Sequence, residues 1–277
     1  ALLVMRTGPG RAIFDFMNDV LRQLLVFTSE GSKFVFGGMM NEFSFALHVL
    51  PTVIFFSSLF AVLYYFGILQ LVIKGFAVVL RRCLNVSGAE ALSSSASIFL
   101  GQTEAPLLVK PFIERMTSSE LLTIMIAGMA HISGGVMAAY AGMGVEAGAL
   151  VTACVMNTLS GIVLAKIIMP ETGTPLTSDL KTVKVEITDR NVLEAASRGA
   201  SEGVYLAINI AAMLIAFIAF IYLFNFIIGI FGTSLEEILG TVLKPIAFLM
   251  GASWDDANSL GVLLGKRAVL NEFIAYY

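Results

Sequence analysis

Hydrophobic residues fill most of this chain in two patterns, long uncharged runs and short apolar arms that end in polar residues. A helix of about 20 apolar residues crosses a bilayer. Three of the four long runs exceed that length, and the third closely approaches it. They are Phe43–Ile73, Leu121–Val145, Ala147–Ala165 and Val204–Phe231. We therefore predict an all-α polytopic membrane protein.

The first short arm, Ala91–Thr103, is uncharged but too short to cross a membrane. The next arm starts at Ala105 and meets Lys110 almost at once. Between the two arms stands Glu104, and a carboxylate at the inner end of an apolar arm must face protein or a water-filled cavity. Two half-length arms joined by a polar tip predict a re-entrant hairpin, which enters and leaves on the same side of the membrane.

The same order of segments returns near the end of the chain. An amphipathic helix at Leu235–Met250 precedes a polar break and a short arm, Leu260–Leu270, which leads to Asn271 and Glu272. Its counterpart in the first half is Gln70–Leu84, followed by Ala91–Thr103. Because one long span separates the two units, the second would enter from the opposite face. Inverted repeats with opposed re-entrant hairpins are typical of secondary transporters.

Shorter features complete the predicted organisation. Apolar residues at helical spacing predict an amphipathic interfacial helix at Arg11–Phe27, followed by a glycine-punctuated connection at Gly31–Asn41. The pair Gly134-Gly135 should weaken or unwind the span that contains it. Pro170–Gly203 is predicted to be a polar loop with a separate amphipathic helix near Val192–Ser201.

Composition agrees with membrane burial. Hydrophobic residues make up 57% of the chain and charged residues 13%, against about 25% charged in a soluble domain. The net charge of −3 and the absence of a basic block exclude a nucleic-acid partner. Cys83 and Cys154 are predicted to be small core residues without a disulfide. The chain begins without Met and stops within a pattern, so we expect a fragment of a longer protein.

Basic residues cluster on one predicted side of the membrane if the first hairpin is re-entrant. By the positive-inside rule that side is cytoplasmic, in the plasma (inner) membrane. The basic residues are Arg81, Arg82, Lys110, Arg115, Lys166, Lys181, Lys184, Arg190 and Arg198. Glu114, Glu120 and Glu171 stand at the ends of spans and are predicted to be solvated.

Several motifs resemble those of the concentrative nucleoside transporter family, in the right order along nearly the whole chain. The most specific are Gly101-Gln102-Thr103-Glu104-Ala105-Pro106 and Asn271-Glu272-Phe273…Ala275-Tyr276. Others are Ser87-Gly88-Ala89-Glu90, Gly134-Gly135-Val136…Ala139-Tyr140, Pro51…Phe55-Phe56-Ser57 and Gly199-Ala200-Ser201-Glu202-Gly203. The resemblance implies a homotrimer whose protomers combine a scaffold with a transport domain that moves like an elevator and takes up nucleosides with a cation.

The resemblance also implies a substrate site. Gln102, Thr103 and Glu104 would contact the nucleobase, and Val136 would pack against it. Glu272, beside Asn271, would accept hydrogen bonds from the ribose hydroxyls, a role that suits a carboxylate. No cofactor is expected beyond the coupling ion.

With the resemblance, the chain divides into six predicted parts. Residues 1–42 form the interfacial helix and its connection, and residues 43–85 a scaffold span with an amphipathic helix. Residues 86–170 hold the first hairpin and two spans of the transport domain, and residues 171–203 the cytoplasmic loop. Residues 204–233 form the long scaffold span, and residues 234–277 the incomplete second hairpin.

The cation site departs from the family's pattern. Its Na⁺ ligands would come from positions matching Ser97, Leu100, His131 and Ile132, whereas sodium-coupled members carry Asn at the first and a hydroxyl residue at the third. Histidine offers nitrogen, a poor ligand for a hard cation, but it can carry a proton near neutral pH. We therefore hypothesise proton coupling or an altered Na⁺ site. The alternative is that His131 only hydrogen-bonds a carbonyl in a broken helix.

Two other classes of function compete with transport. An intramembrane enzyme could use Glu104 and Glu272 as acid and base, but no nucleophile or metal set accompanies them. A channel is less suited than a transporter to a site closed by two hairpin tips. Gly199–Gly203 matches a G-x-S-x-G nucleophile motif, yet no histidine follows it, so it is interpreted as a helix-packing site.

Overall fold

The computed structural model describes residues 8–42, 44–102, 105–175, 177, 189–230, 232–269 and 272–276 of the chain, without the side chains of 8–18 and 276. The described residues contain helices and no strand. The chain forms two compact units, Ala1–Val204 and Tyr205–Tyr277. The helices are α2 (Gly8–Phe36), η1 (Gly37–Asn41), η2 (Phe45–Val49), α3 (Leu50–Tyr65), α4 (Ile68–Leu84), α5 (Gly88–Ala96), η3 (Ala105–Arg115), α6 (Ser118–Ala130), α7 (Gly134–Gly142), α8 (Ala147–Ile168), α9 (Val192–Gly229), α10 (Leu235–Leu249), α11 (Ala257–Val269) and α12 (Glu272–Tyr276).

Four of the described helical segments are long and apolar enough to cross a membrane, as predicted. They are Phe45–Tyr65, Ser118–Gly142, Ala147–Ile168 and Val192–Gly229. The second is the broken helix formed by α6 and α7. Its break lies at residues 131–133, directly before Gly134-Gly135 rather than at the glycine pair itself.

Two predicted boundaries and one predicted burial were wrong. Gly31 does not begin a connection, because α2 continues to Phe36. Val192–Ser201 is not a separate helix within the polar loop, because α9 runs without a break from Val192 to Gly229. Cys83 is exposed rather than part of the core, although both cysteines are free and Cys154 is buried.

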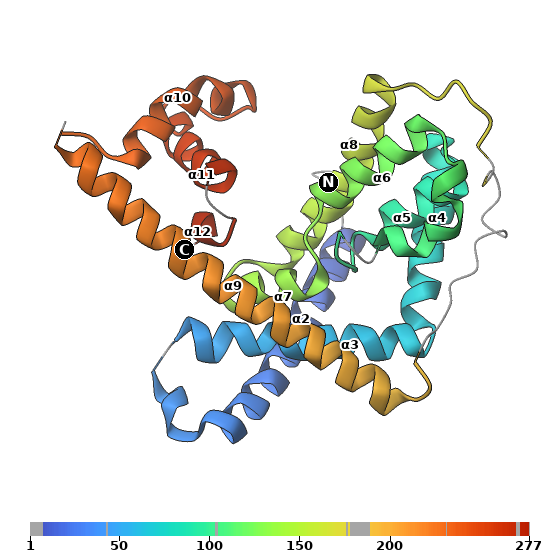
Figure 1. Ribbon diagram of the computed structural model, residues 1–277, viewed down its shortest axis with the longest axis horizontal. Coiled ribbons are helices and arrows are strands. Elements are labelled where there is room, and N and C mark those ends of the chain that lie inside the picture. The colour runs from blue at the N-terminus through green and yellow to red at the C-terminus, as the bar shows by residue number, and fades with distance from the viewer. Residues whose placement is uncertain are drawn as a thin grey trace. The chain divides into compact units, whose positions relative to one another are not determined.

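The centre of the first unit is α5, whose nine residues are all buried. Figure 1 shows it beside α4 and near α6, and it also packs against η3 and α8. Its apolar residues join those of α4 in one hydrophobic cluster. A short helix that is fully enclosed can carry polar groups, because protein rather than lipid surrounds them.

The second unit repeats the order of elements found in the first. The amphipathic helix α10 packs along the short helix α11, and α12 follows after a two-residue interval, as α4, α5 and η3 follow one another. Asn225 of α9 accepts a hydrogen bond from the Leu235 amide at 2.8 Å and thereby caps α10. The predicted inverted-repeat fold therefore has its elements in the expected order.

Close helix packing explains Gly199 and Gly203. A Cβ at Gly199 would lie 2.7 Å from the Ser57 carbonyl oxygen of α3, and one at Gly203 would lie 2.7 Å from the Ile54 Cα. Ser58 also donates its hydroxyl to the Ala196 carbonyl at 2.9 Å. The small residues thus let the backbones of α9 and α3 come into contact where the two helices cross. This contact confirms the interpretation of the motif as a helix-packing site.

The close contact between α9 and α3 predicts how a substitution at Gly199 affects the stability of the protein. We expect Gly199→Ala to destabilise the protein by about 1–3 kcal/mol, because the added methyl group meets backbone atoms that cannot move aside. Gly229→Ala is the matched control, since nothing lies within 4 Å of that Cβ. Thermal unfolding in detergent should show a lower midpoint for Gly199→Ala and no loss for Gly229→Ala. Equal midpoints would contradict the close crossing.

Candidate functional site

The tip of the first hairpin rests against the broken helix. The Gly134 amide, at the start of α7, donates to the Phe99 carbonyl at 2.9 Å. Gln102 lies over Gly128 of α6, where an added Cβ would be 3.7 Å from the Gln102 Cβ. The first contact depends on glycine, because a Cβ at Gly134 would lie 2.9 Å from the Phe99 carbonyl oxygen, whereas a Cβ at Gly128 would make only an ordinary contact with Gln102.

These contacts bring together several of the predicted site residues. Ser97 and Leu100 precede the tip, Gln102 forms it, and His131 and Ile132 occupy the break that the tip contacts. Val136 lies in the first turn of α7, where its amide donates to the Ser133 hydroxyl at 3.3 Å. Thr103, Glu104 and Asn271 lie outside the described residues.

His131 is held by protein oxygens at both ring nitrogens. Nδ1 lies 2.5 Å from the Ala127 carbonyl oxygen. Nε2 lies 3.0 Å from the Cys154 carbonyl oxygen and 2.7 Å from the Thr158 hydroxyl. Thr158 in turn donates to the Cys154 carbonyl at 3.0 Å. Because the Thr158 hydroxyl proton is used in that hydrogen bond, both ring nitrogens of His131 face acceptors. An imidazolium, which has two N–H donors, satisfies both of them.

Ser97 has its hydroxyl hydrogen committed to its own helix. Its Oγ donates to the Ser93 carbonyl at 3.0 Å, and the Ser97 side chain is buried. A hydroxyl that donates in this way still has lone pairs for a cation. Leu100 is held nearby by its amide, which donates to the Ala96 carbonyl at 2.8 Å.

Glu272 belongs to the second unit and has an ion pair there. Its Oε1 lies 3.3 Å from Arg267 Nη2, which comes from the last turn of α11. The half-buried carboxylate is therefore charge-compensated within its own hairpin.

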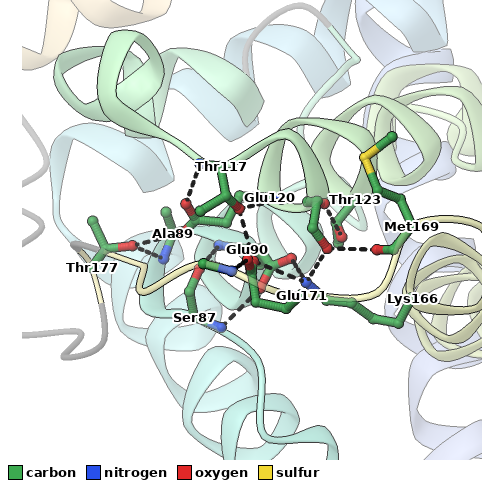
Figure 2. Close-up of polar contacts among 12 residues, drawn as sticks. Ser87, Ala89, Glu90, Thr117, Glu120, Thr123, Lys166, Met169, Glu171 and Thr177 are labelled. Carbon is green, nitrogen blue, oxygen red and sulfur yellow. Dashed lines mark hydrogen bonds and ion pairs between the residues drawn. The ribbon is translucent and has the colours of Figure 1, made fainter.

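A charged cluster at the other end of α5 was missed by the sequence-based analysis (Figure 2). Lys166 of α8 lies 2.5 Å from Glu90 Oε1, and its Nζ donates to the Ser119 hydroxyl at 2.9 Å. Glu90 is 1% exposed, so its charge is taken out of water and needs this partner.

Two capping boxes build this cluster. The Ser87 hydroxyl accepts from the Glu90 amide while the Glu90 carboxylate accepts from the Ser87 amide, and Thr117 and Glu120 repeat the arrangement at α6. Lys166 contacts both Glu90 and Ser119, so α5 and α6 begin close together, and the two ends of the segment between them lie on one side, as a re-entrant hairpin requires. The pattern S/T-x-x-E could have revealed both boxes in the sequence.

Residues after α8 close the cluster. The Thr177 carbonyl accepts from the Gly88 amide at 2.6 Å, and its hydroxyl accepts from the Ala89 amide at 3.1 Å. Glu120 is buried, so its predicted solvation was wrong. Burial alone would raise the pKa of Glu171, but hydrogen bonds from Thr117 and Gly173 and the nearby Lys166 lower it.

Three family models together match almost the whole chain. Residues 1–39 match the model described as "Na+ dependent nucleoside transporter N-terminus", and residues 149–277 match the corresponding C-terminus model. Residues 46–147 match the model described as "Nucleoside recognition".

Named relatives and solved structures agree with these models. The chain is 40% identical to mouse solute carrier family 28 member 3, covering 99% of this chain and 40% of the relative. It is 41% identical to the uncharacterised transporter YutK of Bacillus subtilis, covering 70% of it. The structure of CNTnw in an inward-facing substrate-bound state is similar at a TM-score of 0.91 and 39% identity, covering 99% of this chain and 68% of that one. The chain thus spans about two fifths of the mammalian relative's length.

Proposed function

The chain belongs to the Na⁺ dependent nucleoside transporter family, and from that premise we propose that it works as a secondary active transporter that carries nucleosides into the cell together with a cation. Its spans make it an integral multi-pass membrane protein. We further propose a homotrimer in the plasma (inner) membrane and an elevator-type alternating-access mechanism.

The observation that carries this proposal is the hydrogen bond between Phe99 and Gly134. It joins the hairpin tip to the helix break, and we infer from it that the proposed base-binding and cation-binding positions belong to one site. Gln102 at the tip can match the donors and acceptors of a nucleobase edge with its amide, and Glu272 would accept from the ribose hydroxyls. Since the relatives named above are transporters, transport is favoured over the intramembrane enzyme that Glu104 and Glu272 could have formed.

We propose that the coupling ion is a proton at His131. The family description names Na⁺, for which the matching positions would be Ser97, Leu100, His131 and Ile132. However, both nitrogens of His131 are directed at protein oxygens and neither is free to bind Na⁺. Those oxygens would instead accept hydrogen bonds from a ring that carries a proton on both nitrogens.

Uptake in proteoliposomes tests function and coupling separately. Radiolabelled uridine uptake by the complete protein should be driven by an inward pH gradient and should respond little to a Na⁺ gradient alone. His131→Thr should remove the dependence on pH while leaving a folded protein. Uptake driven by Na⁺ alone would reject the proton and keep the transporter. The absence of gradient-driven uptake for several nucleosides would reject the function itself.

A further inference from the structure

One face of α5 is polar although it is buried. Glu90, Ser93, Ser94 and Ser97 stand at positions i, i+3, i+4 and i+7, so they share an arc of about 100° on the helix. None of the four is more than 1% exposed. A buried helix of a membrane protein normally has apolar or small residues there, and this face therefore needs an explanation.

The hydroxyls of this face lack the partners that buried polar groups require. Within the described part of the chain, the Oγ atoms of Ser93 and Ser94 have no hydrogen-bond partner. Glu90 Oε1 has only its ion pair with Lys166. Buried hydroxyls without a protein partner destabilise a fold unless ordered water satisfies them.

The position of Glu90 shows which way the face is turned. Glu90 contacts Lys166 of α8 and belongs to the cluster that also holds the start of α6 (Figure 2). The opposite side of α5 carries Ala91, Leu92 and Ala96, which belong to a hydrophobic cluster to which α4 contributes four buried residues, η3 three, and α6 and α8 one each. The polar face is therefore directed away from α4.

Polar groups stand at both ends of the face. At one end, Ser97 is one of the positions that match the family's Na⁺ ligands. At the other, Lys166, Glu90 and Ser119 form the charged cluster. Ser93 and Ser94 supply hydroxyls about one helical turn from each end. A hydroxyl oxygen can form hydrogen bonds with water and can also coordinate a small hard cation.

We propose that the Glu90–Ser93–Ser94–Ser97 face of α5 binds a file of water molecules through which a small monovalent cation passes between Ser97 and the charged cluster at Lys166. The passage of a cation rests on the proposed function, whereas the presence of water does not. The water file would satisfy the unpaired hydroxyls and keep the passing ion solvated inside the hairpin.

Cysteine accessibility tests the water file directly. In the complete protein with its other cysteines replaced (Cys83→Ser and Cys154→Ala in this chain), Ser94→Cys should react with a small hydrophilic methanethiosulfonate reagent. The control is Ser95→Cys, because the Ser95 hydroxyl is also buried and has no partner among the described residues but lies about 100° from Ser94 around the helix, outside the polar face. We expect Ser94→Cys to react at least about tenfold faster, since thiols react as solvated thiolates.

Equal rates at the two positions, or no reaction at Ser94→Cys, would overturn the proposal. Because labelling requires no transport, an inert Ser94→Cys in a transporting protein would reject the water file alone. A reactive Ser94→Cys in a protein that moves no nucleoside would reject the proposed function and the passing ion but keep the water.

Alanine variants give a second test if the cysteine variants fail to fold. Ser95→Ala should raise the unfolding temperature, because it removes an unpaired hydroxyl from a dry environment. Ser94→Ala should not raise it, because it removes a ligand of bound water, and it should slow cation-driven uptake. A rise of equal size in both variants, with unchanged uptake, would show that the face is dry.

Discussion

Replacing Lys166 by methionine should lower the free energy of unfolding by about 3–5 kcal/mol, because it leaves a buried carboxylate without its counter-charge. Glu90 is 1% exposed and lies 2.5 Å from Lys166 Nζ. Among the described residues, its other oxygen accepts only from the Ser87 amide, at 2.9 Å. The loss should appear as a lower unfolding temperature in detergent and should reduce uptake, since Glu90 anchors the helix that carries Ser97.

Three controls separate the ion pair from other effects of the substitution. Lys166→Met combined with Glu90→Gln should recover most of the stability, because the amide is neutral. Lys166→Arg should retain it. Lys33→Met removes an ion pair with Glu30 in which both side chains are more than half exposed, and such pairs contribute about 0–1 kcal/mol. If Lys166→Met unfolds at the wild-type temperature, Glu90 does not depend on this partner.

The spans and the order of the repeated elements could be predicted because lipid imposes length and hydropathy on every crossing helix. Boundaries were harder to predict where a polar segment continues into an apolar helix without a break. Val192–Ser201 has polar side chains and resembles a surface helix, yet it joins the long span because nothing in its sequence breaks the helix. The break before Gly134 was placed near the glycines, but Ser133 caps α7 and so fixes the break one step earlier.

Motifs in the sequence indicated candidate site residues, but the sequence did not indicate which charged residues are buried. Glu114, Glu120 and Glu171 were expected to be solvated because they stand at the ends of spans, but position along the chain does not show what covers a side chain. Glu120 is buried because Thr177, 57 residues later, returns to the same helix ends and lies 3.4 Å from it. Likewise the contacts of His131 with Cys154 and Thr158 come from α8, and no local pattern near the helix break indicates them.

Gly134→Ala should disrupt the contact between hairpin tip and helix break more than any other small substitution in the first unit. The new Cβ would lie 2.3 Å from a ring carbon of Phe60 and 2.9 Å from the Phe99 carbonyl oxygen. That oxygen accepts the Gly134 amide, so relieving the overlap separates the tip from α7. We expect a loss of about 1–3 kcal/mol in stability and a large drop in uridine uptake.

A neighbouring glycine provides the comparison. Gly142→Ala, in the same helix, places its Cβ 3.7 Å from the nearest atom of Thr52, an ordinary contact, and should be neutral or stabilising by about 0.5–1 kcal/mol. Phe60→Leu added to Gly134→Ala removes the ring but not the Phe99 carbonyl. If the overlap with the ring causes the defect, this double variant regains uptake. If the backbone contact causes it, as we expect, uptake stays low, because only glycine lets the tip approach the start of α7.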